Sequence, residues 1–131
     1  MKIYTAATFS EQKRIRANKE RLIQLGHSVL STWLEEQIKP AGMLQEQFEK
    51  KMAAKDLQEI NAADCMILDM ENRSSTMGKM IEFGFALAKH KLIYVVGMPP
   101  KGSIFCLLAD LMFPTWDNLF AYFEKNHGEA R

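Results

Sequence analysis

The chain has 131 residues, 47% of them hydrophobic and 25% charged, which is the composition of an ordinary globular protein. This length favours one domain, which we expect to span residues 1–131. The formal net charge of +1 argues against bulk attraction to nucleic acid or to an anionic membrane, so any anion must be held by local groups.

The hydrophobic pattern predicts strands and helices in alternation, with one long loop over residues 35–42. The first half predicts a strand over 2–7, a helix from the candidate N-cap Ser10 to about Leu25 with its basic residues mostly outward, a strand over 28–33, and a helix over 43–61 with an apolar stripe from Leu44 to Ile60. The second half predicts strands over 65–68 and 92–96 joined by a helix over 77–90, then a short helix over 104–111, a strand over 112–115 and a helix over 116–125.

This alternation predicts an α/β fold, a doubly wound parallel sheet of about five strands with helices on both faces, of the flavodoxin or Rossmann kind. We expect the strand order 2-1-3-4-5. That order brings together the carboxyl ends of three central strands, and with them residues 5–10, 69–78 and 97–102. The crevice between these loops is the expected ligand site.

The stretch from Asp64 to Ala88 reads as a buried strand, a loop rich in Ser and Thr, and a helix. Helix N-termini present free N–H groups and a positive dipole end that suit a phosphate, so Ser75, Thr76 and Gly78 are candidate anion-binding residues. The alternative is a loop that merely caps the helix. Glu82 lies one turn into the helix, and we interpret it as a catalytic carboxylate acting on a nucleotide. The alternative is a solvated helix carboxylate, which is the usual state of a Glu.

Asp56 is unusual within the helix expected over 43–61. It lies four residues from Met52 and four from Ile60, which puts a carboxylate on or beside the packed face. In the predicted fold, Asp56 and Glu82 approach the same crevice from different helices. The alternative is that Asp56 pairs with Lys55 or Arg73.

The two cysteines, Cys65 and Cys106, lie in apolar contexts with no CxxC spacing and no nearby His. They suggest neither a zinc site nor a disulfide framework, and a reducing compartment is the simpler assumption. The N-terminal run passes directly into an amphipathic segment rather than into a cleavable apolar region. We therefore expect a cytoplasmic protein.

Three segments together resemble a known group of enzymes. They are Lys2-Ile-Tyr-Thr-Ala-Ala7, Lys55-Asp-Leu-Gln-Glu-Ile-Asn-Ala-Ala-Asp64 and Met77-Gly-Lys-Met-Ile-Glu-Phe-Gly-Phe-Ala-Leu-Ala88. In order and spacing they resemble the nucleoside 2-deoxyribosyltransferase-like superfamily, which includes the transferases and the deoxynucleoside 5′-monophosphate N-glycosidases. Residues 26–34 also resemble a less characterised branch common in phages and bacteria.

The resemblance implies a role for each of three residues. Glu82 would attack the anomeric carbon of the sugar, Asp56 would position the sugar or protonate the leaving base, and Tyr4 would orient the nucleophile or line the pocket. These roles agree with the chemistry, because cleavage of an N-glycosidic bond passes through an oxocarbenium-like state that a carboxylate stabilises or traps.

The chain departs from the family pattern in two places. Thr76 stands where the transferases have an aspartate, and is closer to the serine of the monophosphate hydrolases. A serine and an arginine in the first loop of those hydrolases align with Thr8 and Ser10, so the arginine is missing. Three other cations remain open as phosphate partners, namely Lys79, Arg73 and Arg14.

We therefore expect an enzyme that cleaves the N-glycosidic bond of a (deoxy)nucleoside 5′-monophosphate through Glu82, without a metal or an organic cofactor. The alternatives are a transferase that exchanges bases, and a nucleotide-binding or sensing module that has lost turnover. In the resembling families a neighbouring subunit completes the site. The resemblance therefore implies a homodimer, and we expect residues 104–112 to form its interface. From the net charge we expect no nucleic-acid or membrane partner.

Overall fold

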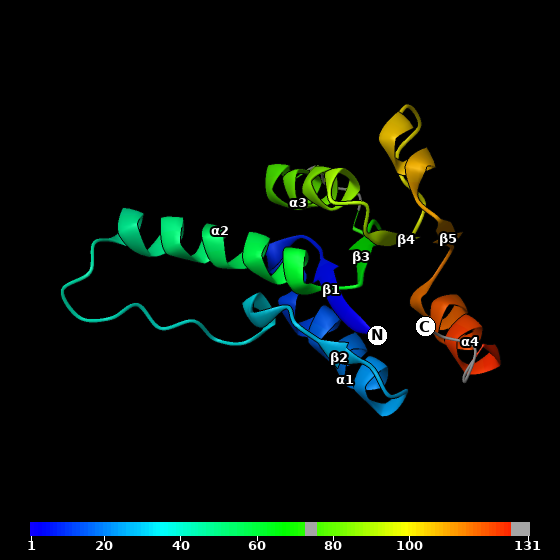
Figure 1. Ribbon diagram of the computed structural model, residues 1–131, viewed down its shortest axis with the longest axis horizontal. Helices are drawn as coiled ribbons and strands as arrows, with labels where there is room; N and C mark the ends of the chain where they lie inside the picture. The colour runs from blue at the N-terminus through cyan, green and yellow to red at the C-terminus, as the bar shows by residue number, and fades with distance from the viewer. Residues whose placement is uncertain (73–75, 127–131) are drawn as a thin grey trace.

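The computed structural model describes residues 1–72 and 76–126, which form a five-stranded sheet with helices on both faces (Figure 1). The strands are β1 (Lys2–Ala6), β2 (Ser28–Val29), β3 (Cys65–Asp69), β4 (Leu92–Val96) and β5 (Leu111–Phe113). The α-helices are α1 (Gln12–Gln24), α2 (Gln45–Ala62), α3 (Met77–Ala88) and α4 (Trp116–Lys125), and the 3-10 helices are η1 (Phe9–Glu11), η2 (Thr32–Leu34) and η3 (Ile104–Leu108).

The sheet has the predicted order, β2-β1-β3-β4-β5, and every pair of neighbouring strands is parallel. Strand β3 is buried along its whole length and β4 along nearly all of it, because helices cover both faces. Helices α2 and α3 pack together on one face, and α1 and α4 on the other. The predicted fold class is therefore confirmed.

The predicted strand over residues 28–33 is wrong beyond Val29. Its last ladder bond joins Leu30 N to Ile3 O at 2.8 Å. Beyond Leu30, side chains rather than a strand form the hydrogen bonds of the Thr5 backbone. The N–H of Thr5 donates to Ser31 Oγ at 2.6 Å, and its carbonyl accepts from Trp33 Nε1 at 2.8 Å. The chain therefore leaves the sheet and forms η2 instead.

The first helix also begins later than predicted. Ser10 lies inside η1 and caps neither helix, since Thr8 precedes η1 and Glu11 precedes α1. Two of the basic residues expected to face outward bend inward. Arg16 donates to Leu34 O at 2.7 and 2.9 Å, and Arg14 pairs with the buried Asp69. A buried carboxylate needs such a counter-charge.

Helix α2 is less buried than its predicted apolar stripe implied. Ile60 is its one fully buried residue, and Leu44, just before its start, is 66% exposed. Figure 1 shows the reason: the N-terminal half of α2 and the loop before it extend beyond the sheet. Residues 109–110 lie outside any helix, since η3 ends at Leu108. In the described part of the chain, no helix has the length and apolar character needed to cross a membrane.

Candidate active site

A cleft of about 310 Å³ lies between α2, α3, η2 and the loop after β1. It brings together the two predicted carboxylates, Asp56 and Glu82, with three of the predicted anion-binding residues, Thr76, Gly78 and Lys79. The remaining lining side chains make an apolar wall, formed by Ala7, Phe9, Trp33 and Met52. The cleft therefore has one apolar side and one side that carries the ionisable groups.

Glu82, which lines this cleft, is hydrogen-bonded to Tyr4. Tyr4 is fully buried in the central strand β1, and its hydroxyl donates to Glu82 Oε2 at 2.7 Å. Burial, and next the charge of Glu82, raise the pKa of Tyr4 far above its usual range, so the hydroxyl remains a donor. It therefore fixes the direction of the Glu82 carboxylate.

The environment of Glu82 disfavours its ionised form. Burial raises the pKa of Glu82 to about 7; the Tyr4 hydrogen bond opposes this rise, whereas Asp56 and Glu59 add to it. At neutral pH the carboxylate is therefore close to half ionised. A carboxylate that is poorly solvated and free of a cation is a stronger nucleophile than one in water.

Asp56 is half-buried and forms no ion pair with any cation in the described ranges, including Lys55. Burial raises the pKa of Asp56 to about 6, the charge of Glu59 adds to the rise, and Lys55 opposes it. A carboxyl group with this pKa can carry a proton near neutrality, which is what a general acid needs. The site thus contains two carboxyl groups whose pKa values are both raised by burial.

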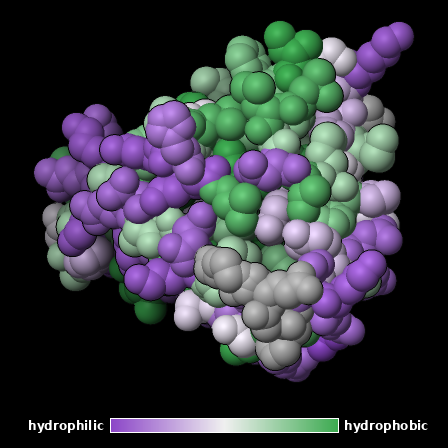
Figure 2. All heavy atoms as spheres, turned by 45° about the vertical axis from the view of Figure 1, so that its right-hand side comes forward, coloured by the Kyte–Doolittle hydropathy of each residue, from purple (hydrophilic) through white to green (hydrophobic). Residues whose placement is uncertain are grey.

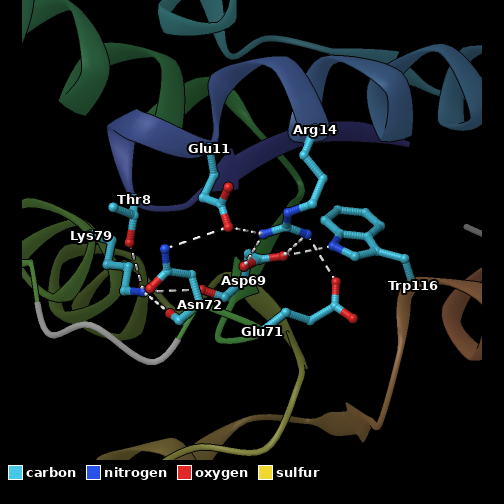
Figure 3. A network of polar contacts seen from close by, with 8 residues as sticks. All are labelled: Thr8, Glu11, Arg14, Asp69, Glu71, Asn72, Lys79 and Trp116. Carbon is cyan, nitrogen blue, oxygen red and sulfur yellow. Dashed lines mark hydrogen bonds and ion pairs between the residues drawn. The ribbon is translucent and has the colours of Figure 1, made fainter.

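Lys79 lies beside the cleft but is only 2% exposed. Its Nζ donates to Thr8 Oγ1 at 3.2 Å, to Asn72 O at 2.8 Å and to Asp69 O at 3.4 Å (Figure 3). Burial lowers the pKa of Lys79. Thr8, another predicted anion-binding residue, is thus 7% exposed and held by this lysine.

Arg14, the second candidate cation, is occupied by carboxylates. It binds Asp69 through two hydrogen bonds of 2.9 and 3.1 Å, Glu71 at 2.8 Å and Glu11 at 3.4 Å. Asp69 also accepts from Trp116 Nε1 at 2.7 Å, which ties the end of β3 to α4 (Figure 3). Sequence analysis missed this network, although a carboxylate ending a buried apolar strand was a possible signal.

The other predicted site residues are Ser10, Ser75 and Arg73. Ser10 is exposed and does not line the cleft, and Ser75 and Arg73 are not among the described residues. Glu59 was missed. It accepts from Thr32 Oγ1 at 2.6 Å and from Thr32 N at 3.2 Å, and so anchors η2, which carries Trp33. Within residues 1–72 and 76–126, no three His, Cys, Asp or Glu side chains are grouped to hold a metal ion.

Comparison with known proteins identifies the family and the fold. The model of the nucleoside 2-deoxyribosyltransferase family matches residues 3–102. No curated protein matches the chain. A solved 2-deoxyribosyltransferase from Bacillus psychrosaccharolyticus is 22% identical, with a TM-score of 0.72 over 94% of this chain and 96% of that one.

Two other solved structures share the fold. The CMP N-glycosidase BcmB of Clostridium botulinum is 19% identical, with a TM-score of 0.62 over 95% of this chain and 98% of that one. A conserved protein from Enterococcus faecalis V583 is 15% identical, with a TM-score of 0.70 over 96% and 98% of the two chains. At these identities the structures support the fold, whereas the family model covers most of the chain. The chain therefore belongs to the nucleoside 2-deoxyribosyltransferase family of enzymes.

Proposed function

We propose that this enzyme cleaves the N-glycosidic bond of a (deoxy)nucleoside 5′-monophosphate, with Glu82 as the nucleophile. One observation carries the proposal: Glu82 is held by Tyr4 in the same cleft as Asp56. A directed nucleophile and a carboxyl group able to carry a proton are the two groups that this bond cleavage requires.

The reaction would proceed in two displacements. Glu82 attacks the anomeric carbon, the bond to the base breaks, and the base leaves with its electron pair and a proton from Asp56. Water then attacks the glycosyl ester at the same carbon, Asp56 takes its proton, and Glu82 is released as a carboxylate. This division of work resembles the two-carboxylate logic of glycoside hydrolysis.

The 5′-phosphate would lie at the N-terminus of α3. The N-cap residue Thr76 makes no side-chain cap hydrogen bond, so its side chain leaves the first-turn N–H groups uncapped. Lys79 adds a positive charge that no described carboxylate pairs with. Because Asp56 and Glu82 repel a dianion, this positive end of the cleft is the favourable place for a phosphate.

A second candidate is base exchange, in which another nucleobase rather than water attacks the glycosyl ester. The family match and the deoxyribosyltransferase structure favour it. Hydrolysis is preferred because Thr76, which lines the cleft, offers a hydroxyl where the transferases have an aspartate. A hydroxyl does not repel a phosphate.

The test is to incubate the protein with a panel of nucleosides and their 5′-monophosphates and to follow free base by chromatography. We expect base release from at least one monophosphate in the absence of an acceptor base. Glu82→Gln should remove it, whereas Glu46→Gln, an exposed carboxylate in the first turn of α2, should not. Tight nucleotide binding with no base release, unchanged in Glu82→Ala, would instead indicate a sensing module.

We also propose that the enzyme is a homodimer that buries an apolar patch around η3. Figure 2 shows this patch as green spheres at the top of the molecule. Its exposed side chains are Met98, Ile104, Phe105, Leu107, Leu108, Leu111 and Met112. A surface this apolar is unusual on a monomer, and the net charge of +1 leaves little repulsion between two copies. Light scattering should give the mass of a dimer, and Leu107→Glu should give that of a monomer.

The compartment proposed for the enzyme is the cytoplasm. Both cysteines, Cys65 and Cys106, are free and buried, and buried thiols of this kind are compatible with a reducing environment. Burial raises the pKa of both thiols, which keeps them protonated and unreactive. Fractionation of the native host should recover the activity with cytoplasmic markers.

A further inference from the structure

We propose that Lys79 is a positioning residue: its ammonium group joins the loop after β1 to the loop after β3 and fixes both relative to Glu82. The inference rests on the proposed function for its catalytic consequence, but its structural content can be tested without turnover. It deepens the proposal by assigning to Lys79 a role other than that of a direct phosphate ligand.

The hydrogen bonds of Lys79 carry the inference (Figure 3). An ammonium group has three N–H donors, and Nζ of Lys79 has three oxygen partners. One partner, Thr8 Oγ1, lies in the loop after β1, and the other two, the carbonyls of Asp69 and Asn72, belong to the segment that leaves β3. These bonds use every donor of the side chain.

Lys79 lies three residues before Glu82 on α3, so the two side chains are neighbours on the helix. A displacement of α3 therefore moves the nucleophile and the lysine together. Because Lys79 is also hydrogen-bonded to both loops, the loops keep a fixed position relative to the nucleophile. Loops held in this geometry offer the substrate a preformed binding surface, so we expect their displacement to weaken substrate binding more than it slows the chemical step.

The burial of Lys79 is costly for stability alone. Lys79 is 2% exposed, and its ammonium group forms no ion pair with a described carboxylate. The group therefore loses hydration that carbonyl dipoles replace only in part. A methionine of similar length would fill the same space without a buried charge. The charge at this position is therefore better explained by the loops that it holds than by packing.

A second contact holds the same segment from the other side. Gly97, at the end of β4, has a φ of +99°, and a Cβ placed there would lie 2.5 Å from the backbone carbon of Met70. Met70 N donates to Val96 O at 2.6 Å. Residues 69–72 are thus held between the backbone of β4 on one side and Lys79 of α3 on the other. Of these two sets of contacts, the one made by Lys79 can be removed by a side-chain substitution.

The experiment measures amide hydrogen exchange in the ligand-free protein, comparing wild type with Lys79→Met. We expect exchange at least tenfold faster in residues 5–10 and 69–72, with no change in the core of β3 and β4. In kinetics we expect KM for the monophosphate to rise about tenfold while kcat changes less than threefold. The matched control is Lys91→Met, a partly exposed lysine that also donates to a carbonyl, Asn61 O, at 2.7 Å.

Unchanged exchange in both loops, with activity lost on monophosphates alone, would show that Lys79 is a direct phosphate ligand and would overturn the proposal. Faster exchange throughout the molecule would assign it a general structural role and would also overturn it. Should Lys79→Met fail to fold, Thr8→Val removes one acceptor only, and faster exchange confined to residues 5–10 is then expected. If the wild type releases no base from any substrate, the proposed function fails, and the exchange data still decide the role of Lys79.

Discussion

The hydroxyl of Tyr4 donates a 2.7 Å hydrogen bond to Glu82 Oε2, and this bond links the middle of the sheet to the helix that carries the proposed nucleophile. It is a short bond to a charged acceptor, from a donor that burial keeps protonated. Because the bond favours the ionised form of Glu82, it acts against the burial that raises the pKa of this carboxyl group.

Tyr4→Phe should therefore shift the titration of Glu82. Without the donor, the pKa of Glu82 rises further above 7, by about one unit. Relative to the wild type at the same pH, we expect kcat to fall about tenfold at pH 6.5 but only about twofold at pH 8, where most of the wild-type carboxylate and about half of the variant's is ionised. The measurement is a pH–rate profile. Tyr122→Phe, on α4 outside the cleft, should behave like the wild type, and an unshifted profile for Tyr4→Phe would contradict the role of the hydroxyl.

The role of Asp56 can be read from the same kind of profile. If Asp56 protonates the base, activity requires Glu82 without a proton and Asp56 with one, and their pKa values are about 7 and 6. We expect a bell-shaped profile of kcat/KM with a maximum between about pH 6 and 7. Asp56→Asn should remove the alkaline limb and lower the maximum. A wild-type profile that rises to a plateau above pH 8 would restrict Asp56 to orienting the sugar.

Glu82→Gln should stabilise the protein while it abolishes activity. The pKa of Glu82 is raised from 4.5 in the unfolded chain to about 7 in the fold, so ionisation costs stability. The cost is absent below pH 4.5, grows as the pH rises toward 7, and is complete above it. We expect a gain in unfolding free energy of about 3 kcal/mol at pH 8 and of less than about 1 kcal/mol at pH 5. Urea unfolding at both pH values is the measurement, and a loss of stability at pH 8 would contradict the burial argument.

The central strands could be predicted from their own residues, without knowing which other segments contact them. Residues 65–68 and 92–96 are continuous apolar runs, which suit strands covered on both faces. The convergence of Asp56 and Glu82 followed from topology, since the strand order decides which helices flank the crevice. The sequence pattern was sufficient to predict the elements that are stabilised by burial of regularly spaced apolar side chains.

Three of the errors have a common physical cause. Strand β2 stops early because Ser31 and Trp33 bind the backbone of Thr5, and Arg14 turns inward because Asp69 is buried at the end of β3. The burial of Lys79 was equally hidden, because two of its acceptors are backbone carbonyls, which no residue type reveals. Each of these three errors depends on a polar contact between different segments of the chain.

Gly97→Ala tests the close approach between β4 and the segment that leaves β3. The φ of +99° at Gly97 is unfavourable for alanine, and its Cβ would lie 2.5 Å from Met70 C and closer still to Glu71 N. Both contacts are with backbone, so the segment must move. We expect a loss of about 3 kcal/mol in unfolding free energy, and a rise in KM because the loop shifts.

The matched control for this substitution is Gly102→Ala, in the loop that follows the same strand. Gly102 has a φ of +92°, but no described atom lies within 4 Å of the point that an added Cβ would occupy, so the substitution adds backbone strain without a clash. It should cost about 1 kcal/mol and leave KM unchanged. Equal losses in the two variants would mean that backbone strain alone explains the effect at Gly97. A larger loss at Gly97, together with the rise in KM, would establish that the segment between Asp69 and Asn72 is held against β4 and that its position matters for substrate binding.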